Sequence, residues 1–209
     1  MSSFSKDERK RIREGLIEAG REQFSRFGHE RTRISDLTEA VDIADSTFYQ
    51  FFDSKGELHL EVLRREQRLV AEEFEQAISD ASDAKTQVAI GFEYFFDELE
   101  SNPLYYELIV GDDIQPLHGR TNKETLETFY QEQFEVIEPH ILRWTELDSF
   151  RIDDPRVMIG IFRMLAFTLL CKEKYEGISP EEFDEIKTKL VEALINGLFI
   201  NRSSIELSS

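Results

Sequence analysis

Apolar residues recur every three or four positions along most of the chain, a spacing that predicts helices rather than strands. One such stripe predicts a long first helix and is made of Ile12, Leu16, Ala19, Gln23 and Phe27, with Phe24 beside it. Gly28 is placed to end that helix, because glycine is favoured just past a helix C-terminus. Further helices are expected at 55–81, 84–101, 103–111, 121–147, 155–175 and 180–202. Pro103, Pro155 and Pro180 mark three of their starts, and the expected fold class is all-α.

Residues 32–58, TRISDLTEAVDIADSTFYQFFDSKGEL, have the most informative pattern. The first half has an apolar stripe at helical spacing, made of Ile34, Leu37, Thr38 and Val41. Asp42 then permits a turn. The second half is expected to point three phenylalanines inward, namely Phe48, Phe51 and Phe52. The opposite face is left to hydrogen-bonding side chains, namely Ser46, Thr47, Tyr49 and Gln50.

This arrangement suits a DNA groove. The major groove admits one α-helix, whose N-terminal side chains must be short and polar to reach base edges, as Ser46 and Thr47 are. The hydroxyl of Tyr49 suits a backbone phosphate, and Lys55 stands at the expected start of the next helix, where free amides also attract phosphate. On this interpretation Lys55→Ala weakens binding to all sequences and lowers the salt slope by about one unit, whereas Thr47→Ala alters sequence preference.

The segment resembles the N-terminal domain of TetR-family transcriptional regulators, whose usual pattern is T-x-x-[IV]-x-x-[IL]-A-x-x-[AG]-G-[VI]-S-x-[GS]-[TS]-[LF]-Y-x-[YH]-F-x-[SN]-K-x-x-L. The match from Thr32 to Leu58 needs no gap. By this resemblance Thr32 caps the first helix of the motif and touches phosphate. The full set of implied DNA-binding residues is Thr32, Arg33, Ser46, Thr47, Tyr49, Gln50 and Lys55.

Three positions depart from the family pattern. Asp42 replaces a turn glycine with positive φ, and aspartate is among the next most tolerant residues there. Ala44 replaces the usual serine cap, so the carboxylate of Asp45 is expected to take over capping. Asp45 also puts a negative charge close to DNA, which argues against a base contact by that residue.

The resemblance implies a domain division as well as a fold. Residues 1–58 would form a three-helix helix-turn-helix DNA-binding domain, and residues 59–209 a helical domain for effector binding and dimerisation. The implied protein is a one-component regulator, usually a repressor that leaves its palindromic operator when a small molecule binds. An alternative is a helical interaction module that has lost DNA affinity, and a weaker one is an enzyme that uses an aromatic cavity.

The middle of the chain is rich in aromatic residues, which suit an apolar ligand cavity but equally a packed core. The expected pocket residues are Phe92, Phe95, Phe96, Tyr105, Phe129, Phe134, Met164 and Phe167. The resemblance implies an effector pocket here, and its aromatic content favours a lipophilic or aromatic effector, with an acyl chain as one option.

The last two helices have apolar seams that favour a four-helix dimer interface over an ordinary internal core. The expected interface residues are Val157, Ile161, Leu165, Leu169, Phe183, Ile186, Leu190, Leu194 and Leu198. Dimerisation also fits the expected function, since a symmetric operator needs two DNA-binding domains about 34–36 Å apart or a multiple of that distance.

Charge complicates the DNA hypothesis, because the net charge is −18. Residues 1–60 hold 10 basic and 12 acidic residues, while residues 61–209 hold 15 and 31, so the acidity lies mostly outside the expected DNA-binding domain. A salt-loving source and an ordinary acidic protein both explain this surface. The basic cluster Lys6, Arg9, Lys10, Arg11 and Arg13 is equally open, as a phosphate-tracking surface or as a solvated helix face with acidic partners.

Other classes of function find no support in the sequence. The chain has no G-x-S-x-G, Walker-type phosphate loop or H-E-x-x-H motif, and its four histidines are isolated, so no catalytic residue, metal or cofactor is expected. No signal peptide or transmembrane run is apparent, and Cys171 stands alone. The expected localisation is cytoplasmic.

Overall fold

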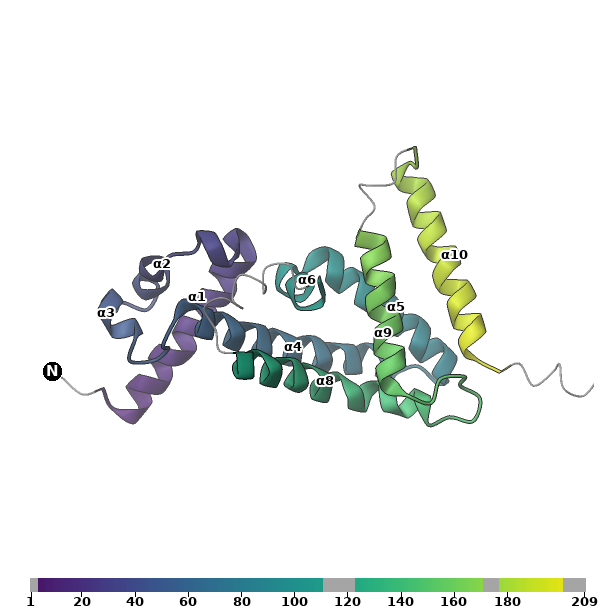
Figure 1. The fold of residues 1–209 in the computed structure, drawn as a ribbon, viewed down its shortest axis with the longest axis horizontal. Helices are drawn as coiled ribbons and strands as arrows, with labels where there is room; N and C mark the ends of the chain where they lie inside the picture. Colours follow the sequence, from purple (N-terminus) through teal and green to yellow (C-terminus); the bar gives the residue numbers. More distant parts are fainter. Residues whose placement is uncertain (1–3, 111–122, 171–176, 201–209) are drawn as a thin grey trace, which may run out of the picture. The chain divides into compact units, whose positions relative to one another are not determined.

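The structure is a computed structural model that describes residues 4–110, 123–170 and 177–200. Within these ranges the regular secondary structure is helical, apart from one isolated antiparallel bridge between Phe150 and Phe199. The all-α prediction is therefore confirmed. The helices are α1 (Lys6–Arg31), α2 (Ile34–Glu39), α3 (Asp45–Phe48), α4 (Lys55–Ser79), α5 (Ala84–Ser101), α6 (Pro103–Val110), α8 (Lys123–Thr145), α9 (Pro155–Leu170) and α10 (Pro180–Leu198) (Figure 1).

Local signals placed the helix starts well. The prediction for α5 matches both of its ends, and the three expected proline starts open α6, α9 and α10. Gly28 leaves the helical region with φ 73°, as a terminal glycine should, although α1 resumes beyond this kink up to Arg31. The other ends of the predicted helices 103–111, 121–147, 155–175 and 180–202 fall in part outside the described residues, as does Cys171.

The expected continuation of α10 beyond Leu198 is wrong. Phe199 takes an extended conformation, and the Leu198 carbonyl accepts a hydrogen bond from the Arg151 amide at 2.8 Å. The Ile200 amide donates to the Ser149 carbonyl, also at 2.8 Å. Pairing with the distant segment around Phe150 supplies the backbone bonds that further helix would have made.

The chain divides into two compact units, Met1–Val70 with Glu100–Gln133, and Ala71–Leu99 with Phe134–Ser209. The first unit packs around fully buried side chains from α1 to α4, with contributions from α6 and α8. They are Leu16, Leu37, Phe48, Leu58, Leu60, Leu63, Leu104 and Phe129. This core supports the segment in which DNA contacts were expected.

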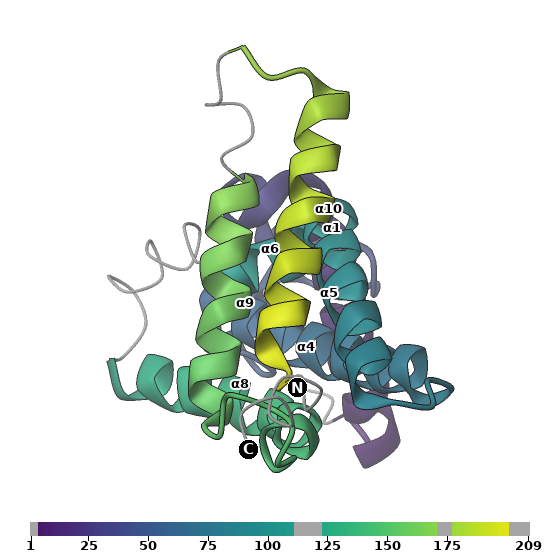
Figure 2. The ribbon, with the colours of Figure 1, turned by 90° about the vertical axis from the view of Figure 1, so that its right-hand side faces the viewer.

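The second unit has an aromatic core. The rings of Phe92 and Phe162 stack with centroids 4.1 Å apart, and Phe95 meets Phe162 edge-on at 5.1 Å. Trp144 is fully buried and its indole N–H donates to Gln87 at 3.1 Å. In this unit α9 (green) and α10 (yellow) run side by side in opposite directions (Figures 1 and 2).

The helices in the described ranges include none with the length and apolar character needed to cross a bilayer.

Candidate nucleic-acid interface

The turn between α2 and α3 has the geometry that the sequence predicts. Asp42 has φ 56°, so it occupies the left-handed region in which the family pattern places glycine. The amides of Val41 and Ile43 donate to the Thr38 carbonyl at 3.3 and 3.1 Å, which closes the turn. The prediction for Asp42 is confirmed, and aspartate holds this conformation without glycine.

The underside of α3 is apolar, as expected. Phe48 and Phe52 are buried and their ring centroids lie 5.9 Å apart, while Phe51 is partly buried against the same core. Phe48 and Phe52 join Leu37 and Leu16 in the core of the first unit. This packing holds α3 with its other side towards solvent.

The outward side presents the polar side chains named from the sequence. Ser46 and Gln50 are exposed, Thr47 is half-buried, and Tyr49 is 56% exposed with its ring edge-on to Phe48. Within the described residues none of these four side chains makes a hydrogen bond to the protein. Regular α3 ends at Phe48, so Tyr49 and Gln50 stand on the turn that follows it. Hydrogen-bonding capacity therefore remains unused on this surface.

The expected capping role of Asp45 is wrong. Ala44 is the N-cap of α3 and no side chain caps the helix. Instead, the buried hydroxyl of Thr38 donates to Asp45 Oδ1 at 2.6 Å. The carboxylate thus joins α2 to α3 instead of capping α3.

The expected phosphate contact through the Thr32 side chain is also wrong. Thr32 is 2% exposed, and its hydroxyl donates to the Gly28 carbonyl at 2.9 Å. It stands at the C-terminal cap of α1, whereas Arg33 is the N-cap of α2. Burial at the end of α1 removes this side chain from any surface that DNA reaches.

Lys55 begins α4 as predicted, yet its ammonium group has partners within the protein. Nζ donates to the carbonyl oxygens of His29 at 2.5 Å and Thr32 at 2.7 Å. Nothing in the sequence pattern signals these bonds, since they join residues 26 and 23 positions apart.

The N-terminal basic cluster divides between the two interpretations. Arg9 donates to the Gln50 carbonyl at 2.9 Å, and Arg13 lies 3.5 Å from Glu61. Their guanidinium groups lie over the rings of Phe51 and Phe52, at 5.0 and 5.1 Å from the centroids. The side chains of Lys6, Lys10, Arg11 and Arg33 are exposed, and none of them makes an ion pair or hydrogen bond in the described part of the chain.

The expected pocket residues are divided between the two units. Phe92, Phe95 and Phe96 are packed in the second unit, whereas the buried Tyr105 and Phe129 belong to the first. Phe134 lies beneath the Arg156 guanidinium, 4.4 Å from its ring centroid.

Two of the pocket assignments, on α9, are contradicted by exposure. Met164 is 74% exposed and Phe167 is 45% exposed, so both face solvent rather than an enclosed cavity. Apolar residues occupy most positions of α9, so the 3.6-residue spacing does not single out one inward face, and this is the reason for the error.

The expected dimer residues lie mostly on an accessible surface. Val157, Ile186 and Leu190 are exposed, whereas Leu198 is 3% exposed and packs within its own unit, which contradicts its assignment. The partly buried side chains among them are those of Ile161, Leu165, Phe183 and Leu194. The side chain of Leu169 lies outside the described residues.

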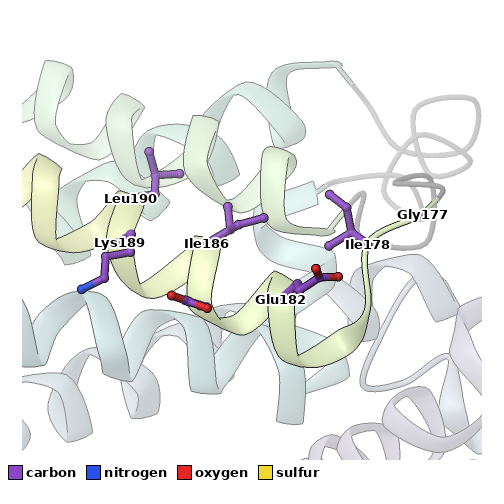
Figure 3. Close-up of a pocket in the computed structure, with 7 residues that line it drawn as sticks. Gly177, Ile178, Glu182, Ile186, Lys189 and Leu190 are labelled. Atoms are coloured by element: carbon purple, nitrogen blue, oxygen red, sulfur yellow. The ribbon is translucent and has the colours of Figure 1, made fainter.

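An open groove of about 620 Å³ runs along the start of α10. In Figure 3 Ile186 and Leu190 project from the same side of the helix, and Lys189 points away from them. The residues that line the groove are Gly177, Ile178, Glu182, Glu185, Ile186, Lys189 and Leu190.

Sequence reasoning missed a buried polar cluster in the first unit. The rings of His29 and His59 stack 5.0 Å apart, and His59 Nε2 lies 3.2 Å from Glu107 Oε2. Burial, together with the charges of His59 and Lys55, lowers the pKa of His29 to about 4. Histidines 30 positions apart give no local signal. No group of three metal-ligating side chains suited to a metal ion occurs in the described ranges.

The geometry defines a helix-turn-helix protein, with a short second helix held on a phenylalanine base and a polar side left open. Residues 16–62 match the family model described as bacterial regulatory proteins, tetR family. Over this segment the chain is therefore similar to the TetR family of bacterial regulatory proteins.

A curated relative and two solved structures extend the comparison. The chain is 30% identical to the HTH-type transcriptional activator FasR of Mycolicibacterium smegmatis over 98 residues, which are 47% of this chain and 45% of FasR. The match thus spans less than half of that relative. RolR in complex with resorcinol has TM-score 0.65 at 15% identity, covering 96% of this chain and 93% of RolR. FadR of Bacillus subtilis in complex with stearoyl-CoA has TM-score 0.57 at 14% identity, and the match covers 88% of this chain and 98% of FadR. At these identities both structures support the fold alone.

Proposed function

We propose that this protein is a one-component transcriptional regulator that binds operator DNA through residues 1–58 and responds to a small molecule through residues 59–209. The observation that supports it best is the exposed polar surface of Ser46, Thr47, Tyr49 and Gln50, held outward by the buried rings of Phe48 and Phe52. Short polar side chains on an exposed helix suit base edges in a major groove.

Phosphate contacts are assigned to exposed cations that have no protein partner among the residues that the structure describes. Arg33 stands at the start of α2, and Lys6, Lys10 and Arg11 lie on the first turns of α1. Each phosphate neutralised releases condensed counterions, so binding should weaken with salt. The acidic residues concentrated after position 60 repel DNA only weakly beyond a Debye length of roughly 8 Å at physiological salt.

A homodimer would supply the second DNA-binding domain that a palindromic operator requires. Exposed apolar side chains on the adjacent helices α9 and α10 support this assignment, among them Val157, Met164, Phe167, Ile186 and Leu190. Burying such a surface against a second copy is favourable.

Ile186→Asp should convert the dimer to a monomer in analytical ultracentrifugation, whereas a change at an exposed polar position of the same helix, Thr188→Ala, should not. A wild-type monomer at micromolar concentration would contradict the assignment.

The proposed effector is lipophilic or aromatic. The aromatic core of the second unit supports an apolar ligand, and the structural neighbours were solved with resorcinol and with stearoyl-CoA. Because Phe92 and Phe162 are stacked in contact, an effector that enters between them has to separate these rings. We propose that the protein represses transcription. The relative FasR is named as an activator, so activation is the outcome that would contradict this proposal.

Fluorescence anisotropy with DNA flanking the protein's own gene tests DNA binding. Wild type should bind one segment far more tightly than an unrelated duplex, and Thr47→Ala and Gln50→Ala should each reduce that preference. Loss of one base contact costs about 1–3 kcal/mol. Gln76→Ala, at an exposed glutamine of α4, is the matched control and should bind as wild type. A dimer that binds no segment would favour the interaction-module alternative.

The same assay identifies the effector class. Stearoyl-CoA and resorcinol are added to the complex at increasing concentration, with free coenzyme A as the control for the head group. Release of DNA by either compound supports a repressor that is relieved by an apolar ligand. Tighter binding with stimulation of a reporter gene would instead support activation.

A further inference from the structure

Lys55 joins the two ends of the segment that holds the DNA-facing side chains. We call residues 33–54 the recognition segment, since α2 and α3 lie within it. Thr32 immediately precedes this segment and Lys55 immediately follows it. The Lys55 ammonium donates to the Thr32 carbonyl at 2.7 Å and to the His29 carbonyl at 2.5 Å. One side chain therefore closes the base of the recognition segment.

The end of α1 requires such a donor. Carbonyl groups in the last turn of a helix lack backbone partners, and Gly28 interrupts the regular helix just before this point. A cation is favourable near a helix C-terminus because of the helix dipole. His29 is buried beside the same carbonyls, so little water is available to replace the ammonium.

Other contacts constrain the recognition segment farther along. Arg9 donates to the Gln50 carbonyl beyond α3, and Thr38 donates to Asp45 between α2 and α3. These bonds leave the outward polar side chains unused while fixing the backbone beneath them. The Lys55 bonds differ from the others because they join the two ends of the recognition segment.

We propose that Lys55 is a positioning residue for DNA recognition, which holds the ends of the recognition segment together before DNA arrives. This inference rests on the proposed function and assigns to Lys55 a role other than a phosphate contact. A preorganised segment loses less conformational freedom on binding, so its closure favours the specific complex. Nonspecific binding depends mainly on exposed cations and should be nearly independent of Lys55.

Charge-retaining and charge-removing variants distinguish the two roles. Lys55→Arg keeps the positive charge, but a planar guanidinium group replaces the compact ammonium between the two carbonyl oxygens. A phosphate contact tolerates this change and positioning does not. Lys10→Arg and Lys10→Met, at an exposed lysine of α1 that makes no ion pair or hydrogen bond within the described residues, are the matched controls.

The experiment measures the dissociation constants for operator DNA and for an unrelated duplex from 50 to 300 mM KCl. Both Lys55→Arg and Lys55→Met should lose about tenfold or more in operator affinity, keep wild-type affinity for the unrelated duplex, and keep the wild-type salt slope. If Lys10 contacts phosphate, Lys10→Met lowers the slope by about 0.9. Lys55→Arg with wild-type operator affinity, or a slope lowered by about one in Lys55→Met, overturns the proposal.

Hydrogen exchange in the absence of DNA gives an independent readout. Amides of residues 33–54 should exchange faster in both Lys55 variants than in wild type, with unchanged exchange in the Lys10 variants. Unchanged exchange in Lys55→Arg overturns the closure. If Lys55→Met fails to fold, judged by circular dichroism, the arginine variant still decides. Wild type that binds no DNA refutes the proposed function, and exchange then tests the closure separately.

Discussion

Single polar atoms determine much of the local arrangement around α3. Asp45 stands on the recognition segment beside the proposed DNA surface, yet its carboxylate accepts a hydrogen bond from the buried Thr38 hydroxyl at 2.6 Å. The same hydroxyl lies 3.0 Å from the Ile34 carbonyl, which offers a second acceptor within α2. The negative charge is therefore retained for local structure at some cost in attraction for DNA.

Asp45→Asn tests this balance. The amide oxygen can still accept from Thr38, but more weakly than a carboxylate, so the free energy of unfolding should fall by about 1 kcal/mol. Removal of a negative charge should at the same time raise DNA affinity a few-fold at low salt. Urea denaturation and anisotropy measure the two effects. Stability and affinity that fall together would contradict the trade-off.

His29 predicts a pH dependence of stability. Its pKa is lowered from 6.5 to about 4 in the folded protein, chiefly by burial and then by His59 and Lys55. The unfolded chain therefore binds a proton at higher pH than the native protein does. Stability should be fully present above about pH 6.5, fall as the pH drops towards 4, and lose on the order of 2–3 kcal/mol in this window.

Denaturation of wild type and His29→Phe at pH 7.5 and 4.5 isolates this contribution. Phenylalanine fills a similar space beside Phe24 and does not titrate. The acid-induced loss of stability should be smaller in the variant by the amount assigned to His29. Equal losses in both proteins would show that other groups cause the acid sensitivity.

At the scale of helices, short-range signals were sufficient for starts and turns. Pro103, Pro155 and Pro180 marked helix starts, and Asp42 marked a left-handed turn, because each depends on the residue and its immediate neighbours. Ends and partners were harder. The end of α10 depends on pairing near Phe150, and the bonds of Lys55 reach back more than 20 residues. Contacts of that range are absent from a local pattern.

Close helix packing in the second unit depends on Gly91 of α5. A Cβ atom built there would lie 3.1 Å from the rings of both Phe74 and Trp144. Both rings are buried, so neither can move without disturbing its neighbours. Gly91→Ala should therefore lower the free energy of unfolding by about 1–3 kcal/mol despite the better helix propensity of alanine.

Gly160 of α9 provides the control for this packing effect. Apart from its chain neighbours and the adjoining backbone of α9, no atom of the described residues lies within 4 Å of a Cβ built at Gly160, so alanine is accommodated there without overlap. Gly160→Ala should be neutral or slightly stabilising through helix propensity. Urea denaturation compares the two variants, and equal stabilities would show that the core around Phe74 relaxes around the added methyl group.

At the scale of the whole molecule, the net charge of −18 dominates the electrostatics of the folded protein. Repulsion among unbalanced carboxylates opposes the compact state, so added salt should raise the melting temperature by screening. Partly buried ion pairs, such as Arg21 with the buried Glu66 at 2.7 Å, are screened less than exposed charges are. Salt should thus remove more repulsion than attraction.

The salt range over which stability rises separates the two explanations of the acidic surface. The Debye length falls to about 10 Å at 0.1 M and about 3 Å at 1 M, so simple screening of repulsion is nearly complete well below molar salt. An ordinary acidic protein should therefore reach a constant melting temperature by about 0.5 M KCl. A salt-adapted protein should continue to gain stability and remain soluble up to 2–3 M KCl. Sulfate salts stabilise proteins generally by exclusion, so the comparison requires chloride alone. A melting temperature that is unchanged or lower between dilute and molar KCl would contradict both the repulsion argument and salt adaptation.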